Sequence, residues 1–164
     1  GRSQQKLDAL KNQIIEEYSV EVDVFACDIT SEKQRNDMIC YADEKGYKFK
    51  RIINVAGVDT QKAFMEYTLD KGMFQLRVNA EATVCLTHQL LNRRTKNCEL
   101  LTVSSMSGAT PMPYFALYSA TKAMLTNLFT ALHYELKKDG VKVTSVLPGG
   151  VPTRPDLIEE ILNK

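Results

Sequence analysis

Apolar and polar positions follow two rhythms along the chain, and these predict helices and strands in turn. Residues 3–18 carry an apolar residue every three or four positions, from Leu7 to Tyr18, as an amphipathic helix does. Shorter apolar runs, bounded by glycine, proline or polar residues, indicate strands. Strands are predicted at 20–27, 51–56, 99–104 and 141–147, and further helices at about 32–45, 67–93 and 117–138. Helix and strand therefore alternate.

Residues typical of helix ends support two of these boundaries. Ser31 and Gln34 form a capping-box pattern at the start of the helix predicted at 32–45, and Gly46 follows its end. The long helix predicted at 117–138 ends on lysines followed by Gly140, which suits the helix dipole and a left-handed cap.

The alternation predicts an α/β fold, a Rossmann-like, doubly wound parallel sheet in three α/β/α layers. We expect residues 1–164 to form a single domain, since this length suits one core. Ligands of such sheets bind at the carboxyl ends of the strands. In this sequence those ends are Asp28, Asn54 to Gly57, Ser104 to Gly108 and Pro148 to Thr153. The site is therefore expected along this edge.

Charge and cysteine usage exclude several classes of function. The 21 basic and 20 acidic residues are mixed, which argues against a nucleic acid partner, and no apolar stretch is long enough to span a bilayer. The cysteines Cys27, Cys40, Cys85 and Cys98 form no CxxC pair and have no ligand-like spacing to a histidine. We expect no metal site, reduced thiols and a cytoplasmic location.

The strongest chemical signal is the pair Tyr118 and Lys122. Four residues apart on a predicted helix, they share one face. A tyrosine with its ordinary pKa of about 10 is a poor acid near neutrality, and a nearby ammonium stabilises the phenolate. The pair suits proton transfer, although the spacing alone also fits an exposed helix pair.

Two residues and one short motif that can bear chemistry precede this pair. Ser105 precedes Tyr118 by thirteen residues, Asn79 precedes Ser105 by 26, and Asn54 opens an Asn-Val-Ala-Gly run. Together these residues resemble the short-chain dehydrogenase/reductase family over residues 1 to about 154. The 3-ketoacyl-CoA reductase and hydroxysteroid dehydrogenase branch is more faintly similar.

The resemblance implies a role for each of four residues. Tyr118 would protonate the carbonyl oxygen, and Lys122 would favour tyrosine ionisation and bind the nicotinamide ribose. Ser105 would orient the substrate oxygen, and Asn79 would hold a water in the proton relay. Taken alone, Asn79 would read as a locally bonded helix residue.

The resemblance also implies the cofactor contacts. Asp28 would accept from the adenine amine, although it also suits the start of a helix. The remaining contacts would come from Asn54, Ala56, Gly57, Tyr118, Lys122, Pro148, Gly149, Val151 and Thr153. Val55 stands where the family motif has a second asparagine. Arg2, one residue after Gly1, matches the position that accepts the 2′-phosphate, so NADP is the expected cofactor.

One family feature does not occur in the sequence. The only glycine before Tyr18 is Gly1, so the strand and glycine-rich turn that bind the pyrophosphate are lacking. We therefore expect a chain truncated at both ends, with a gap or a foreign strand between 20–27 and 51–56. We also expect residues 1–164 alone to bind NADP(H) weakly and not to turn over.

Two functions remain open. The first is an NADP-dependent oxidoreductase, dimeric or tetrameric, acting on a small ketone or secondary alcohol. An apolar, lipid-like or acyl substrate suits the pocket-side residues Met106, Pro111, Met112, Pro113, Tyr114 and Phe115. The second is a catalytically silent interaction module that uses the helical segments 79–93 and 117–138 for pairing.

Overall fold

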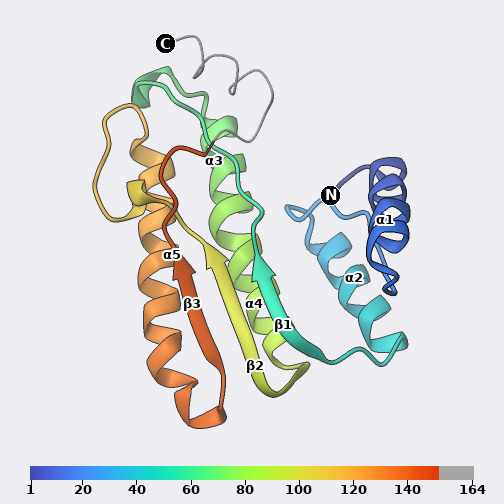
Figure 1. The fold of residues 1–164 in the computed structure, drawn as a ribbon. Helices are drawn as coiled ribbons and strands as arrows, with labels where there is room; N and C mark the ends of the chain where they lie inside the picture. Colours follow the sequence, from blue (N-terminus) through green and yellow to red (C-terminus); the bar gives the residue numbers. More distant parts are fainter. Residues whose placement is uncertain (152–164) are drawn as a thin grey trace.

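A three-stranded parallel sheet forms the centre of the protein. The computed structural model describes residues 1–151. The strands β1 (Phe49–Asn54), β2 (Arg94–Val103) and β3 (Lys142–Val146) lie in the order β1-β2-β3 (Figure 1). Because all three run parallel, their carboxyl ends meet at one edge. This confirms the predicted Rossmann-like α/β class. Thr153 lies outside the described residues.

Residues 1–151 contain five α-helices close to the four predicted ones, because the helix predicted at 67–93 is divided into two. They are α1 (Gln4–Tyr18), α2 (Glu32–Glu44), α3 (Leu69–Leu76), α4 (Ala82–Leu91) and α5 (Ala116–Glu135). Ser3 and Thr68 cap the amino ends of α1 and α3, and Gly140 takes the left-handed conformation after a 3-10 turn that follows α5. Figure 1 shows α1 and α2 beside the β1 edge of the sheet.

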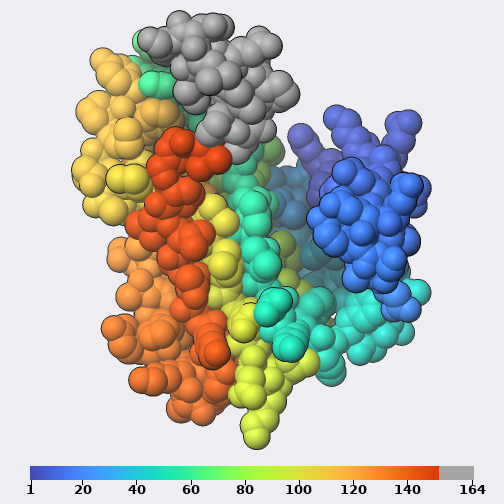
Figure 2. Space-filling view, viewed as in Figure 1, coloured from blue at the N-terminus to red at the C-terminus, as the bar shows by residue number. Residues whose placement is uncertain are grey.

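Helices α4 and α5 bury one face of the sheet. Ile52, Leu100 and Val143 point from the three strands into a core that also contains Leu125 and Phe129 of α5. The opposite face carries the alternate positions of each strand. Among the described residues it is an open, shallow surface formed by Arg51, Ile53, Glu99, Leu101, Lys142 and Thr144 (Figure 2).

The strand prediction for residues 20–27 is wrong for this structure. The segment does not form a strand, and within residues 1–151 its backbone bonds outside local structure only through the N–H of Cys27, which donates to Gly1 O at 2.8 Å. A strand needs a neighbouring ladder for its backbone groups, and no described segment supplies one. For the same reason the second edge of β1 is unpaired in residues 1–151, with Ile53 58% and Val55 63% exposed.

Two further details differ from expectation. The Ser31 Oγ caps α2 by accepting from Gln34 N, as predicted. The Gln34 side chain, however, does not return to Ser31: its Oε1 accepts from the backbone N–H of Asp28 at 2.8 Å. Asn79 lies in a π-helical turn, Arg77–Glu81, between α3 and α4. Such wide single turns recur at functional sites.

Candidate functional site

The ammonium of Lys122 lies at the centre of the candidate site. The helix α5 places it 5.6 Å from the centre of the Tyr118 ring, and its Nζ donates to the carbonyl of Val103 at 2.8 Å. Burial lowers the pKa of Lys122, and the nearby carboxylate of Asp59 opposes that shift. A buried ammonium whose pKa is lowered beside a phenol ring is suited to proton chemistry.

The side chain of Asn79 is fully buried and holds the loop that follows β1. Its Oδ1 accepts from Val58 N and its Nδ2 donates to Val58 O, both at 2.8 Å. The Nδ2 also donates to Thr121 Oγ1 at 3.1 Å, and Thr121 Oγ1 in turn donates to Tyr118 O. Asn79 therefore connects the β1 loop to the helix that carries Tyr118.

Gly57 lies where these groups meet. A Cβ at Gly57 would stand 3.3 Å from Lys122 Nζ and 3.6 Å from Asn79 Oδ1. Three residues earlier, Asn54 Nδ2 donates to Thr87 Oγ1 at 3.0 Å, which attaches the end of β1 to α4. Val55, Ala56 and Gly57 are exposed. The chain thus keeps an uncovered backbone surface beside Lys122, as the close approach of a flat ligand requires.

Ser105 lies at the end of β2, beside the segment that follows β3. Its Oγ accepts from the N–H of Ser107 at 3.2 Å and from the Ser107 hydroxyl at 2.8 Å. The next residue, Met106, donates its N–H to Pro148 O at 3.0 Å. A Cβ at Gly149 would meet the Met106 sulfur at 3.4 Å. The predicted Pro-Gly segment therefore adjoins Ser105, and Val151 follows it exposed.

The predicted adenosine contacts lie in the segments that precede α1 and α2. Cys27 bonds to Gly1, and this places Arg2 and Asp28 near one another. The Asp28 carboxylate accepts from the Thr30 hydroxyl at 2.7 Å and from the Thr30 N–H at 3.0 Å. These bonds, with a smaller contribution from the positive charge of Arg2, lower the pKa of Asp28.

These observations make the site fit a dinucleotide. A cation and a carboxylate lie at one end, and a glycine surface with a buried ammonium lies at the other. Carboxylates and cations are the groups that bind an adenosine ribose in this class of fold.

The sequence did not predict that three further residues contact Lys122 or its helix and hold it in place. Ser104 Oγ donates to the carbonyl of Lys122 at 2.8 Å and also contacts Thr126. Gly108 packs so closely on α5 that a Cβ there would stand 2.7 Å from the Lys122 carbonyl carbon. Thr121 is the third. For Ser104 and Gly108, the Ser-Ser-x-x-Gly pattern before Tyr118 is the sequence feature that could have indicated this role.

The apolar residues predicted for a substrate pocket divide into two groups. Pro111, Met112 and Pro113 help to line a hollow of about 700 Å³ against the Ala116, Ala120 and Ala123 face of α5. Tyr118 and Lys122 do not line that hollow. Met106, which follows β2, and Tyr114, whose carbonyl accepts from Lys62 N, are instead strongly exposed. Phe115 is half-buried with its ring 5.9 Å from that of Tyr118.

Solved structures share this fold. The bulky-bulky ketone specific alcohol dehydrogenase from Comamonas testosteroni superposes with a TM-score of 0.83 at 25% identity, over 99% of this chain and 69% of that one. ElxO with NADP bound gives a TM-score of 0.85 at 23% identity, over 99% of this chain and 66% of that one. The second likeness, at this low identity, shows the fold alone. Within residues 1–151, no helix is both long and apolar enough to cross a bilayer.

Sequence relatives give the family. The very-long-chain 3-oxoacyl-CoA reductase of Bos taurus is 35% identical over 163 residues, which cover 94% of this chain and 51% of that protein. An uncharacterised oxidoreductase of Staphylococcus aureus strain USA300 is 30% identical over 155 residues, 93% of this chain and 66% of that protein. The chain thus spans about half to two thirds of these relatives. The family model described as short chain dehydrogenase matches residues 1–157. The chain belongs to the short-chain dehydrogenase family.

Proposed function

We propose that the protein containing this chain is an oxidoreductase that transfers hydride between NADP(H) and a ketone or secondary alcohol. The observation that carries the proposal is the convergence of Tyr118, Lys122 and Asn79 around the open backbone at Gly57. A phenol beside a buried ammonium can exchange a proton, and the glycine surface leaves room for the cofactor beside it.

Each residue has a separate task in this proposal. The nicotinamide, when bound, supplies or accepts the hydride. The Tyr118 hydroxyl gives its proton to the carbonyl oxygen in reduction and takes it back in oxidation. Lys122 holds positive charge beside the ring, and the Ser105 hydroxyl orients the substrate oxygen. Asn79 fixes the β1 loop and, through Thr121, the helix turn at Tyr118.

NADP is the cofactor we propose, because Arg2 acts electrostatically on Asp28 at the adenosine end. An arginine there can pair with a 2′-phosphate, whereas a free 2′-hydroxyl is usually read by a carboxylate. The partner is a small molecule, and the family's common oligomers make a homodimer or homotetramer the proposed assembly.

An apolar, acyl-type carbonyl is the substrate class we propose. Met106 and Tyr114 expose large apolar surfaces. The bovine relative is named for its action on 3-oxoacyl-CoA, a ketone on a long apolar chain.

Replacing Tyr118 by phenylalanine in the complete protein tests the proposal. We expect turnover to fall by about 10²–10⁴ or more, the usual contribution of general acid catalysis, while NADPH affinity stays near the parent value. Tyr134→Phe, which removes an exposed phenol at the carboxyl end of α5, is the control and should remain active. Turnover of Tyr118→Phe at half the parent rate would refute the assignment. A parent with no NAD(P)-dependent turnover of ketones or secondary alcohols would favour the interaction module.

A further inference from the structure

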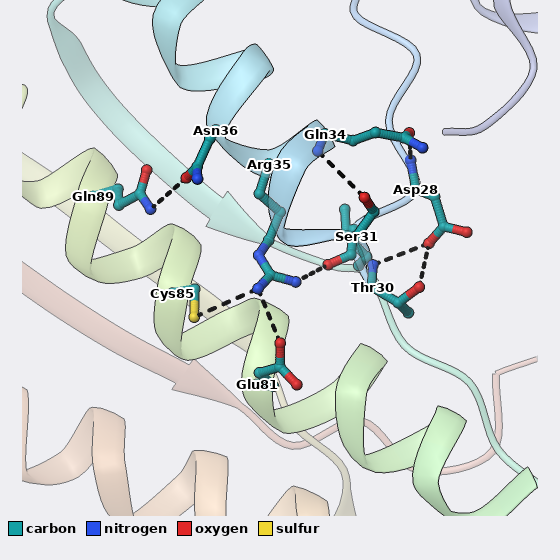
Figure 3. Close-up of polar contacts among 10 residues, drawn as sticks. Asp28, Thr30, Ser31, Gln34, Arg35, Asn36, Glu81, Cys85 and Gln89 are labelled. Atoms are coloured by element: carbon teal, nitrogen blue, oxygen red, sulfur yellow. Dashed lines mark hydrogen bonds and ion pairs between the residues drawn. The ribbon is translucent and has the colours of Figure 1, made fainter. Parts of the chain in front are cut away.

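One buried cation outside the Tyr118 site has partners in three separate segments. Arg35 of α2 is only 4% exposed. Its Nη1 donates to the carbonyl of Ile29 at 2.6 Å, and its Nη2 donates to Glu81 Oε1 at 2.9 Å (Figure 3). The same Nη2 lies 4.0 Å from the Cys85 sulfur. A guanidinium removed from water is stable only where such partners hold it in one place.

The first partner belongs to the loop that presents Asp28. Ile29 lies between Asp28 and Thr30, whose N–H and hydroxyl both donate to the Asp28 carboxylate. Consecutive side chains of α2 bind consecutive residues of this loop: Gln34 accepts from Asp28 N, and Arg35 donates to Ile29 O (Figure 3). The position of the Asp28 carboxylate therefore depends on α2.

The second partner belongs to the turn that carries Asn79. Glu81 is the last residue of the π-helical turn Arg77–Glu81, in which the N–H of Ala82 reaches back to Arg77 O. Glu81 is half-exposed whereas Arg35 is buried, so the ion pair links the interior beside α2 to the surface of this turn. One planar fork thus joins the Asp28 loop to the Asn79 turn.

We propose that Arg35 is a positioning residue that holds the Asp28 loop in register with the Asn79 turn, so that both ends of the cofactor site keep a fixed separation. The inference rests on the proposed function, in which Asp28 meets the adenine and Asn79 supports the Lys122 end. Arg35 itself touches neither reacting group.

A second arginine provides a matched comparison. Arg93 also bridges α2 to the end of α4, through bonds of 2.5 and 2.6 Å to Asp43 and of 2.9 Å to Gln89 O. It contacts the far end of α2, away from Asp28. If Arg35 only joined two helices, losing either arginine would have the same effects.

The experiment compares Arg35→Leu, Arg35→Lys, Glu81→Gln and Arg93→Leu in the complete protein. The readouts are thermal stability, NADPH Kd by fluorescence, and amide hydrogen exchange without cofactor. Both Arg35 variants should bind NADPH about tenfold more weakly, because a displaced Asp28 would lose its charge-assisted hydrogen bond to the adenine. Exchange should accelerate in residues 28–31 and 77–82 together. Glu81→Gln keeps an acceptor and should show a smaller effect on both.

Arg93→Leu should lower the melting temperature without accelerating either segment or raising the Kd. The lysine variant decides the question should Arg35→Leu not fold, since an ammonium cannot serve both partners as the fork does. Parent exchange rates in both segments of Arg35→Lys, or equal acceleration in Arg93→Leu, would overturn the proposal. A parent that binds neither NADPH nor NADH would refute the proposed function instead, and the exchange rates would still decide whether Arg35 couples the segments.

Discussion

Lys122 Nζ lies 5.6 Å from the centre of the Tyr118 ring while donating to Val103 O at 2.8 Å. The sheet therefore holds the ammonium in place, and the ring lies within the range of a cation–π contact. Burial that favours this geometry also disfavours the charge, as the lowered pKa of Lys122 shows. Function and stability oppose each other at this residue.

Lys122→Met should separate the two effects, the loss of activity and the gain in the free energy of unfolding. Because the folded pKa of Lys122 lies below the unfolded value of about 10.4, the unfolded chain binds more protons between these two values. The contribution of Lys122 to the free energy of unfolding therefore rises with pH through that window, and its penalty is fully present below the folded pKa. Chemical denaturation of parent and Lys122→Met across alkaline pH measures the difference.

The variant should lose turnover and bind NADPH more weakly, yet remain at least as stable as the parent near neutrality. Taking the difference between the two proteins cancels the other alkaline groups, notably Tyr47, whose pKa the Asp23 hydrogen bond raises to about 12. A difference that stays flat with pH would contradict the buried, charged state of Lys122.

Asn79→Leu should destabilise the protein as well as slow it. The leucine would leave the N–H and carbonyl of Val58 without the partner that both have in Asn79, and unpaired polar groups of this kind cost about 1–3 kcal/mol. Urea denaturation gives the loss, and steady-state kinetics gives the rate. Asn54→Leu, which breaks one side-chain bond to Thr87, is the control and should cost less. Equal losses of stability in the two variants would show that the pair of bonds between Asn79 and Val58 contributes no more than the single bond between Asn54 and Thr87.

The sequence predicted which of these side chains lie together better than it predicted the sheet around them. Tyr118, Lys122 and Asn79 are brought together as their spacing predicted, because local helix geometry and parallel strand ends determine those positions. The strand prediction for residues 20–27 was wrong because a strand needs a neighbouring strand to bond with, and an alternating sequence pattern does not show whether one is present. The hydrogen bonds of Arg35 could not be predicted from the sequence pattern either, since its partners Ile29 and Glu81 lie in different segments.

The two glycines Gly140 and Gly108 show the same difference between what local sequence predicts and what depends on tertiary contacts. Gly140 could be predicted from its place after a helix, whereas Gly108 depends on a tertiary contact with α5. Gly108→Ala would place a methyl group 2.7 Å from the Lys122 carbonyl carbon and 2.8 Å from its oxygen. Backbone cannot yield as a flexible side chain does, so we expect a loss of about 1–3 kcal/mol and a displaced Lys122.

Gly150→Ala is the matched control for Gly108→Ala, since a Cβ at Gly150 meets no atom of the described residues 1–151 within 4 Å. Thermal stability should fall for Gly108→Ala and stay near the parent for Gly150→Ala, and turnover should also fall for Gly108→Ala. Parent-like stability of Gly108→Ala would mean that the loop 106–115 shifts away from α5 without cost.

Arg2→Ala should reverse or erase a preference for NADPH over NADH. The guanidinium lies close enough to influence Asp28, and a charge-assisted pair with a 2′-phosphate is worth about 1.5–3 kcal/mol, or roughly ten- to hundredfold in affinity. NADH lacks that phosphate, so its kcat/KM should change little, while that for NADPH falls. The ratio of the two kcat/KM values, in the parent and in Arg2→Ala, is the measurement. Lys6→Ala, an exposed cation on the first turn of α1, controls for a general loss of positive charge. A parent that prefers NADH, or a ratio that Arg2→Ala leaves unchanged, would remove the argument for NADP while leaving the Tyr118 chemistry intact.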